Sequence, residues 1–173
     1  VHKVPTYVRS SFDDPADPKP GTLICDEEDI VEQQVVTGIA FSKDEAQITL
    51  RGVADRPGVA AAIFMPLAEA NIDVDMIIQV VSDDRATTDL TFTVPVAEFE
   101  KAKKIIEGLR GVTYTELAGT TDVVKISAIG VGMRSHAGVA QRMFKTLSDK
   151  GINIQVISTS EIKISVLIAE EYT

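Results

Sequence analysis

The chain has 173 residues, of which 45% are hydrophobic and 25% charged, with a net charge of −9 and a pI near 4.7. This composition is typical of an ordinary globular protein of one or two domains. The acidic excess, an aromatic content of only 5% and the lack of tryptophan argue against a nucleic-acid partner, because nucleic-acid binding needs clustered basic side chains and rings for stacking. No apolar run approaches the length of a membrane span, so no membrane partner is expected.

The cysteine and histidine content excludes further kinds of site. Cys25 is the only cysteine, so neither an intrachain disulfide nor a cysteine-rich metal site is expected. His2 and His136 lie too far apart in the sequence to form a metal-binding pair, and no metal site is predicted. The single cysteine and the lack of a signal-peptide pattern predict a reducing, cytoplasmic environment.

Residues 1–34 differ from the rest of the chain. A short strand is predicted at 4–8, and the Pro/Asp/Gly-rich stretch 13–21 is predicted to be a loop. The acidic run 26–29 indicates a solvated linker or the start of a helix. This segment is not expected to form a core of its own.

The hydrophobic periodicity sharpens after residue 35. Period-two alternation predicts strands, and helical spacing of apolar residues predicts helices, ended by Asn71 and by Gly111. After an initial strand at 35–41, the first unit is predicted to be βαββαβ, with strands at 46–53, 72–78, 89–94 and 112–115 and helices from Val59 to Ala68 and from Val96 to Leu109. A second unit follows, with strands at 124–129, 152–157 and 161–168 and one helix that carries Val139, Met143, Phe144 and Leu147 and ends at Lys150-Gly151.

The two units are copies of one another. Seven identities recur at a constant offset of 80 residues, from Gly58 and Gly138 to Ile77 and Ile157. Such a repeat indicates that one structural unit was duplicated. The second copy is one helix and one strand short, and the strand at 35–41 belongs to no part of the first copy. We therefore predict that this strand completes the second sheet; an edge extension of the first sheet is the alternative.

The predicted fold class is α+β, with two ferredoxin-like units, each a four-stranded antiparallel sheet with helices on one face. The first unit is inserted in the second. The predicted domains are a tail and linker at 1–34, a first domain at 43–118, and a second domain made of 35–42 and 119–173. This fold alone does not determine function, because many unrelated proteins share it.

The chain contains no established nucleophile, zinc-protease or P-loop motif. Gly130-Val131-Gly132 follows a strand, as phosphate loops do, but no third glycine follows at the required spacing. Asp73 and Asp75 fall on one face of a predicted strand, and this pattern has two interpretations. They are paired carboxylates for acid–base chemistry, or simply a solvent-facing acidic edge.

The turn from strand to helix at Asp55–Ala60 is the strongest candidate for binding. Unpaired backbone N–H groups and the positive end of the helix dipole favour a carboxylate at a helix N-terminus. Gly58 allows close approach to the backbone, and Asp55 offers an acceptor for an ammonium group, so the corner suits a free amino acid. The alternative is a plain helix start with Asp55 as its cap.

Several stretches resemble one known family. Asp55–Ala60 with Asn71–Gln79 resembles the first ACT domain of the aspartate kinases, and Ser135–Ala140 with Ile152–Ser165 resembles the second. Val8–Phe12, followed by Pro20–Thr22, is similar to the end of the kinase domain in that family. The match covers nearly the whole chain but not the catalytic part. The chain therefore resembles the regulatory portion of the enzyme or its small β-type subunit, which also suits a sequence that does not begin with methionine.

The resemblance implies a role in feedback regulation. In this family the parent enzyme transfers phosphate from ATP to L-aspartate, with ATP and Mg in the kinase domain and no cofactor in the regulatory part. The ACT domains bind threonine and/or lysine, and they form a homodimer through ACT–ACT contacts. The implied partners are thus these effectors, a second copy of the chain, and a catalytic kinase domain or α-type subunit. The resemblance implies no catalytic residue in this chain.

The resemblance also implies two effector sites, each shared between two chains. The implied threonine site is Asp55, Gly58, Ala60 and Gln79 of one chain with Asn153 and Ile154 of its partner. The implied second site is Met133, Ser135, His136, Gly138, Val139, Ala140 and Ser160, facing Asp73, Val74 and Asp75 of the partner. Asp75 corresponds to Gln155 in the repeat, so the second site carries more negative charge and we expect it to suit lysine.

Three other functions remain open from the sequence. One is a stand-alone amino-acid sensor or transcription-regulator module, although no basic DNA-binding segment is present. Another is an ACT-type sensor subunit of a different biosynthetic enzyme. The third is a ferredoxin-like enzyme that works through Asp73 and Asp75.

Overall fold

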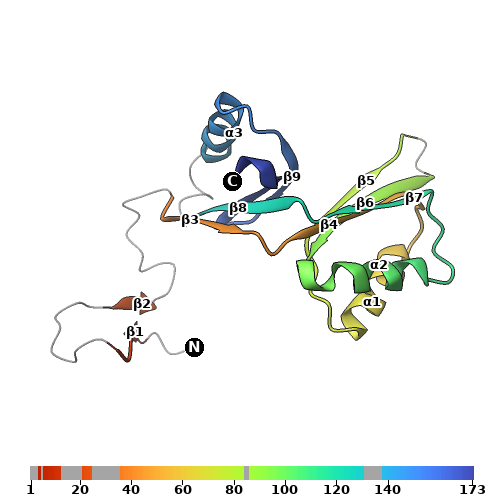
Figure 1. Ribbon diagram of the computed structural model, residues 1–173, viewed down its shortest axis with the longest axis horizontal. Coiled ribbons are helices and arrows are strands. Elements are labelled where there is room, and N and C mark those ends of the chain that lie inside the picture. Colours follow the sequence, from red (N-terminus) through yellow and green to blue (C-terminus); the bar gives the residue numbers. More distant parts are fainter. Residues whose placement is uncertain (1–3, 5, 13–20, 25–35, 84–85, 131–137) are drawn as a thin grey trace.

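The computed structural model describes residues 4, 6–12, 21–24, 36–83, 86–130 and 138–173. Two four-stranded antiparallel sheets form the body of the chain (Figure 1). A separate pair of short strands, β1 (Thr6–Val8) and β2 (Thr22–Ile24), forms an antiparallel ladder near the N-terminus. In the described part of the chain, no helix combines the length and apolar character needed to cross a membrane.

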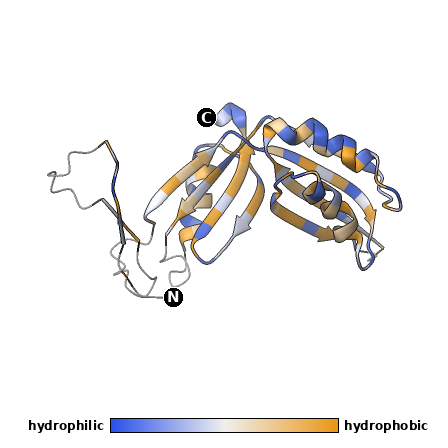
Figure 2. Cartoon of the chain, turned by 90° about the horizontal axis from the view of Figure 1, so that it is seen from below, coloured by the Kyte–Doolittle hydropathy of each residue, from blue (hydrophilic) through white to orange (hydrophobic). Residues whose placement is uncertain are grey.

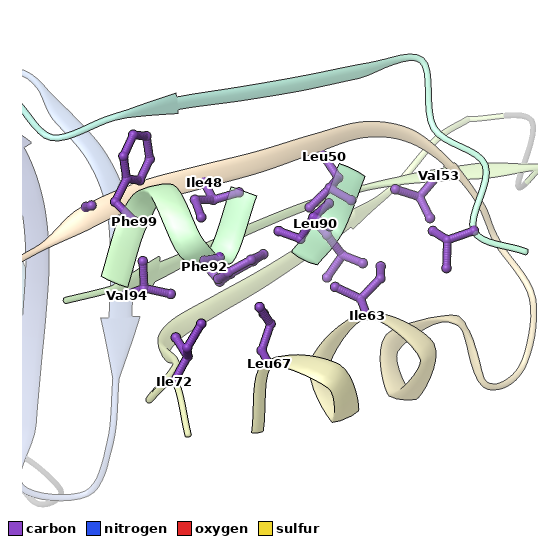
Figure 3. Packing of buried hydrophobic residues seen from close by; sticks show 14 of the residues in the cluster. Ile48, Leu50, Val53, Ile63, Leu67, Ile72, Leu90, Phe92, Val94 and Phe99 are labelled. Carbon is purple, nitrogen blue, oxygen red and sulfur yellow. The ribbon is translucent and has the colours of Figure 1, made fainter. Parts of the chain in front are cut away.

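The first unit has the strand order β5-β6-β4-β7 and carries both of its helices on one face. Leu50, Leu90 and Phe92 of the central strands are fully or almost fully buried and face Ile63 of the first helix (Figure 3). Ile106 of the second helix belongs to the same buried cluster. The elements are β4 (Ala46–Ala54), α1 (Val59–Glu69), β5 (Asp75–Val81), β6 (Thr87–Val94), the 3-10 turn η2 (Val96–Glu98), α2 (Phe99–Glu107) and β7 (Glu116–Thr120).

The second unit has the strand order β3-β8-β10-β9. Strand β3, which precedes the first unit in the sequence, pairs with β8 along its whole length, from Gly38 opposite Ile129 to Ser42 opposite Lys125. The prediction that this strand completes the second sheet is confirmed, so the first unit is inserted in the second. The elements are β3 (Gly38–Ser42), β8 (Val123–Ile129), α3 (Val139–Asp149), β9 (Ile154–Thr159), β10 (Lys163–Ala169) and the 3-10 turn η4 (Glu170–Tyr172).

Several predicted boundaries were wrong by two or more residues. The last strand of the first unit is Glu116–Thr120 and not 112–115, because Val112 is buried in the core as part of a loop and Tyr114 packs against the same core. Strands β5, β9 and β10 each begin two or three residues later than predicted, and β6 begins two residues earlier. After each helix the chain first turns back, with Ile72 N–H donating to Leu67 O and Ile152 N–H to Leu147 O.

Other predictions fall partly outside the described residues. Val35, the acidic run 26–29 and the loop 13–20 lie there, as do Asp84 of the predicted turn and residues 131–137 before α3. In the part that the structure describes, the second unit has the single α-helix α3, in agreement with the helix predicted there from Val139, Met143, Phe144 and Leu147. Figure 2 shows hydrophobic and hydrophilic residues alternating along the strands and helices of both units.

The two units contact each other through their sheets, and their helices lie on the outer sides (Figure 1). Strand β5 of the first unit lies against β9 of the second. Met76, Val123, Val156 and Leu167 form a buried apolar cluster between the units, with Ile78 packed beside it. This inter-unit cluster places the start of β5 at the junction of the two units.

Replacing Leu50 by alanine should lower the free energy of unfolding by roughly 2–5 kcal/mol, because it leaves a cavity in a core that excludes solvent. Ile39→Ala is the matched control, since Ile39 is 76% exposed and its truncation should cost well under about 1 kcal/mol. Urea unfolding followed by circular dichroism measures both. Equal losses for the two variants would contradict this description of the core.

Candidate functional site

Each unit has an open corner where its first helix begins. Gly58 is the N-cap residue of α1 and Gly138 that of α3, and both have positive φ angles, of 89° and 104°. No side chain caps either helix among the described residues. A Cβ at Gly58 would meet nothing within 4 Å, so glycine is needed there for its backbone conformation and the space beside it is open. Both corners therefore present helix N-terminal N–H groups without a side-chain cap.

The surroundings of Asp55 exclude the plain helix-cap interpretation. Its backbone N–H donates to Ala86 O at 3.0 Å, which holds the corner beside the β5–β6 hairpin. The neighbouring Arg56 guanidinium donates to Gly111 O and anchors the turn from the other side. Asp55 itself is exposed and makes no capping bond to α1. Gln79 is exposed on β5, the strand that ends at this hairpin.

A hollow lies at the other end of each first helix, next to an edge strand. The first hollow has a volume of about 370 Å³ and the second about 360 Å³. The first is lined by Phe64, Ala68, Asn71, Ile72, Asp73, Val74 and Ile77. The second is lined by Phe144, Ser148, Gly151, Ile152, Asn153 and Ile154. All six residues of the second hollow are counterparts, 80 positions along, of residues in the first.

The structure separates the predicted threonine-site residues into two groups. Asp55, Gly58 and Ala60 lie at the N-terminal corner of α1, whereas Asn153 and Ile154 line the second hollow in the other unit. Helix α1 has 11 residues and is thus about 16 Å long, so a corner and the hollow of its own unit are well apart. No corner residue lines either hollow in the described part of the chain.

The second predicted set is divided in the same way. Gly138, Val139 and Ala140 form the corner of α3, and Ser160 lies in the β9–β10 turn, where its N–H donates to Lys163 O at 2.7 Å. Asp73 and Val74 line the first hollow, and Asp75 follows them as the first residue of β5. Met133, Ser135 and His136 of this set lie outside the described residues.

Lys125 forms an ionic cluster between the two units that the sequence did not predict. Its ammonium lies 2.8 Å from Asp75 Oδ2 and also pairs with Glu45. The Lys125 and Glu45 side chains are only 18% and 7% exposed, whereas Asp75 is 54% exposed. Glu45 and Lys125 are counterparts in the repeat, 80 positions apart. We call Glu45, Asp75 and Lys125 the inter-unit clamp.

The clamp changes the pKa values of Asp75 and Lys125. The hydrogen bond from Lys125 lowers the pKa of Asp75, a further hydrogen bond from Met76 N–H acts in the same direction, and partial burial opposes them. Burial lowers the pKa of Lys125, but its hydrogen bonds to Asp75 and Glu45 outweigh that effect and raise it above the ordinary value. Both directions favour the charged, paired state at neutral pH.

The backbone next to Asp75 is strained. Met76 has a φ of 39°, in a region that non-glycine residues rarely adopt, and the β5–β6 register shifts between Asp75 and Ile78. At this bulge, the side chains of Met76 and Ile78 belong to the inter-unit cluster, while Ile77 between them lines the first hollow. Asp73 lies before the strand, so the prediction that Asp73 and Asp75 share a strand face was wrong, and the acid–base pair loses its geometric basis.

Comparisons with known proteins agree with this arrangement. Sequence profiles described as the ACT domain match residues 48–111 and 126–173. An aspartate kinase of Pseudomonas fluorescens is 52% identical over 173 residues, which are 99% of this chain and 41% of that protein. The regulatory subunit of aspartate kinase from Thermus thermophilus, in its ligand-free form, is 41% identical with a TM-score of 0.75, over 80% of this chain and 91% of that one.

A structure of aspartokinase alpha and beta subunits is 50% identical with a TM-score of 0.72, over 80% of this chain and 90% of that chain. Fold and profiles thus define a protein with two ACT domains. More closely, the chain belongs to the aspartate kinase family and corresponds to its regulatory region. It spans about two fifths of the length of the curated relatives it matches.

Removing the Lys125 charge should destabilise the folded chain. Lys125→Met leaves the buried Glu45 carboxylate without its partner, and we expect a loss on the order of 3 kcal/mol of unfolding free energy. Arg51→Met is the matched control, because the Arg51–Glu116 pair at 3.0 Å is exposed and should contribute about 1 kcal/mol or less. Urea denaturation of both variants tests this. A Lys125→Met variant as stable as Arg51→Met would refute the clamp.

The stabilising effect of Asp75 should depend on pH. Its pKa is lower in the folded than in the unfolded state, so its contribution is present above the unfolded pKa of about 3.9 and is lost as the pH falls through the folded value. The stability difference between wild type and Asp75→Asn should be largest from about pH 5 to about pH 8 and vanish in acid. Urea unfolding at each pH measures it, with Asp73→Asn as the control for the loss of one exposed carboxylate.

Proposed function

We propose that this chain is the regulatory part of an aspartate kinase, an enzyme that transfers phosphate from ATP to L-aspartate, and that it binds threonine and/or lysine for feedback inhibition. In this proposal ATP and Mg belong to a catalytic kinase domain or an α-type subunit, which acts together with this chain. The family and the extent of the match support a regulatory role. The single cysteine suits a cytoplasmic enzyme.

The separation of corners and hollows carries the proposal. Each corner offers backbone N–H groups for a carboxylate, and the first corner adds Asp55 for an ammonium group. Each hollow offers an apolar wall with a few polar atoms, which suits an amino-acid side chain. Since neither corner lines a hollow of its own chain, a complete site would combine the corner of one chain with the hollow of another.

Exposed apolar residues support such a dimer. Ile77, Val80 and Val81 on β5 are 54%, 61% and 49% exposed, and Ile157 on β9 is 42% exposed. Both are edge strands with one unpaired side, and an edge of this kind is a template for pairing with another chain. In the proposed dimer, the β5 edge of one chain meets the β9 edge of its partner, and this contact places Asn153 and Ile154 of the partner opposite the Asp55 corner.

An effector bound between chains regulates through its differential affinity. A ligand shifts an equilibrium between two dimer arrangements only by as much as it binds one of them better. The affinity for an amino acid that contacts the corner of one protomer and the hollow of the other depends directly on the relative position of the two protomers. The inserted topology then carries a change of position to the first strand of the chain body, β3, and onward to a catalytic partner.

Isothermal titration calorimetry tests the proposal on the 173-residue chain. We expect heat with threonine or lysine at millimolar ligand, and Asp55→Ala should abolish threonine binding because it removes the acceptor for the ammonium group. The fold should persist, since Asp55 is exposed and its structural bond is made by the backbone. Glu107→Ala, an exposed acidic residue on α2, controls for net charge and should bind normally.

Two outcomes would remove this proposal. One is the absence of heat with both amino acids. The other is a chain that binds them but sediments as a monomer at every concentration, because the proposed sites need two copies. Analytical ultracentrifugation with and without ligand distinguishes these cases.

A further inference from the structure

Each duplicated unit has a β-bulge in the strand that follows its first helix, but not at the same position. In β5, Asp75 lies opposite Thr93 and Ile78 opposite Thr91, so three steps along β5 match two steps along β6. The extra residue of β5 therefore follows Asp75. Met76, directly after it, has a φ of 39°, which non-glycine residues rarely adopt.

In β9 the extra residue comes earlier. Ile154 and Val156 lie opposite neighbouring residues of β10, so the extra residue is Gln155. Gln155 is the counterpart of Asp75, 80 positions along the chain. Val156, the counterpart of Met76, is not among the described non-glycine residues with a positive φ. The second unit thus shows a second way in which this segment pairs with its neighbour, without a positive φ at the bulge.

The position of the bulge determines one wall of the first hollow. Ile77 lies in the bulge and lines this hollow. Its counterpart Ile157 is paired opposite Val166 in the ladder of the second unit, and among the described residues it does not line the second hollow. The other residues that line the first hollow all have counterparts in the second. The Ile77 wall therefore distinguishes the two hollows.

A residue of the second unit holds Asp75 in the ladder. Lys125 lies on β8, and its Nζ is 2.8 Å from Asp75 Oδ2. Lys125 is itself fixed in place, because its side chain is only 18% exposed and also pairs with the buried Glu45. Asp75 is thereby kept opposite Thr93, and the extra residue has to follow it.

The apolar cluster between the units does not determine where the bulge lies. Met76 and Val156 both belong to this cluster, although their strands have bulges at different positions. Gln155 carries no charge and offers an ammonium group no ion pair, whereas the Asp75 carboxylate does. The charge at this position is thus a difference between the two copies that bears directly on the bulge.

We propose that Lys125 is a positioning residue for the first hollow. By pairing with Asp75 it places the bulge at Met76 and Ile77, and the bulge gives the hollow its Ile77 wall. This inference rests on the proposed function, in which amino acids bind at the hollows, and refines it, because one wall of the first hollow then depends on the second unit. Without the Lys125 contact, the bulge should move to Asp75, as in the second unit, and Ile77 should enter the ladder opposite Phe92.

Cross-strand nuclear Overhauser contacts locate the bulge without any ligand. In the wild-type chain we expect a contact between Asp75 and Thr93. In Lys125→Met we expect this contact to be lost and a contact between Ile77 and Phe92 to appear. Both contacts are read from the backbone protons of the folded 173-residue chain.

Three further variants control this measurement. Lys125→Arg keeps a cation beside Asp75 and should retain the wild-type contacts. Arg51→Met breaks an exposed ion pair elsewhere on the first unit and should also retain them. Asp75→Ala leaves the Glu45–Lys125 pair in place, so it removes the same hold on the bulge without leaving a buried carboxylate unpaired. It therefore gives the same test if Lys125→Met does not fold.

Titrations with threonine and with lysine test the effect on binding. The methyl groups of Val74 and Ile154 report on the first and second hollow separately. Lys125→Met should weaken binding at the first hollow about fivefold, because the ligand loses part of an apolar wall, and should change binding at the second by less than about twofold. Ile77→Ala should have a similar effect, and the double variant should bind no more weakly than either single one, because both changes act on the same wall.

The outcomes separate this inference from the proposed function. Wild-type contacts that persist in Lys125→Met and Asp75→Ala would overturn the inference, and so would an equal loss of affinity at both hollows. A wild-type chain that binds neither amino acid would remove the proposed function, while a bulge that moves in Lys125→Met would still support its placement by Lys125. A bulge that moves in Lys125→Met but not in Lys125→Arg, with weaker binding at the first hollow alone, supports both.

Discussion

The contact between the two units is the constraint on which the rest of this structure depends. Lys125 pairs with Glu45, and Met76 shares an apolar cluster with Val156. In both cases a residue meets its own counterpart, 80 positions along the chain. Strands β5 and β9, also counterparts, lie against one another. Contacts between equivalent residues are the signature of a two-fold interface, so the duplicated units meet like the subunits of a symmetric dimer joined in one chain.

The contact between the two units also explains why backbone strain is tolerated at Met76. A non-glycine residue with positive φ costs about 1–3 kcal/mol and persists only where the surroundings over-determine it. Here the Met76 side chain is buried between the units, and its N–H donates to the Asp75 carboxylate. Because Asp73 and Ile77, which flank Met76 in the sequence, line the first hollow, the strained segment connects that hollow directly to the junction of the units.

The fold was largely predictable because its signals are local or repeated. The constant offset of 80 residues revealed the duplication, and the strand missing from the second copy identified Gly38–Ser42 as an inserted partner, which the pairing with β8 confirms. The boundaries that failed depend on tertiary context. Val112 and Tyr114 have the composition of a strand but pack against the core as a loop, and periodicity alone does not distinguish these two states.

The candidate site was predictable only in part, for a different reason. The corners have a sequence signature, since Gly58 and Gly138 sit at fixed offsets before apolar helices and both adopt the positive φ that glycine permits. The clamp has none, because Lys125 lies 50 residues from Asp75 and 80 from Glu45, and nothing in the local pattern marks a charged strand residue as buried. The charge of the second predicted site was therefore overestimated, because the sequence does not reveal that the Asp75 carboxylate pairs with Lys125.

Opposite charges at equivalent positions also restrict how these units associate. If the same surface of two first units met between chains, Glu45 would face Glu45, and two second units would bring Lys125 against Lys125. Like charges in a largely dry interface are strongly unfavourable, so this surface accepts only the pairing of a first with a second unit. Within one chain that pairing is already satisfied. In the proposed dimer, the outer edges of β5 and β9, beside the two hollows, are left for the association of two chains. The opposite charges of Glu45 and Lys125 thus fix the two units to each other and, in the proposed dimer, leave a second copy of the chain to bind beside the hollows.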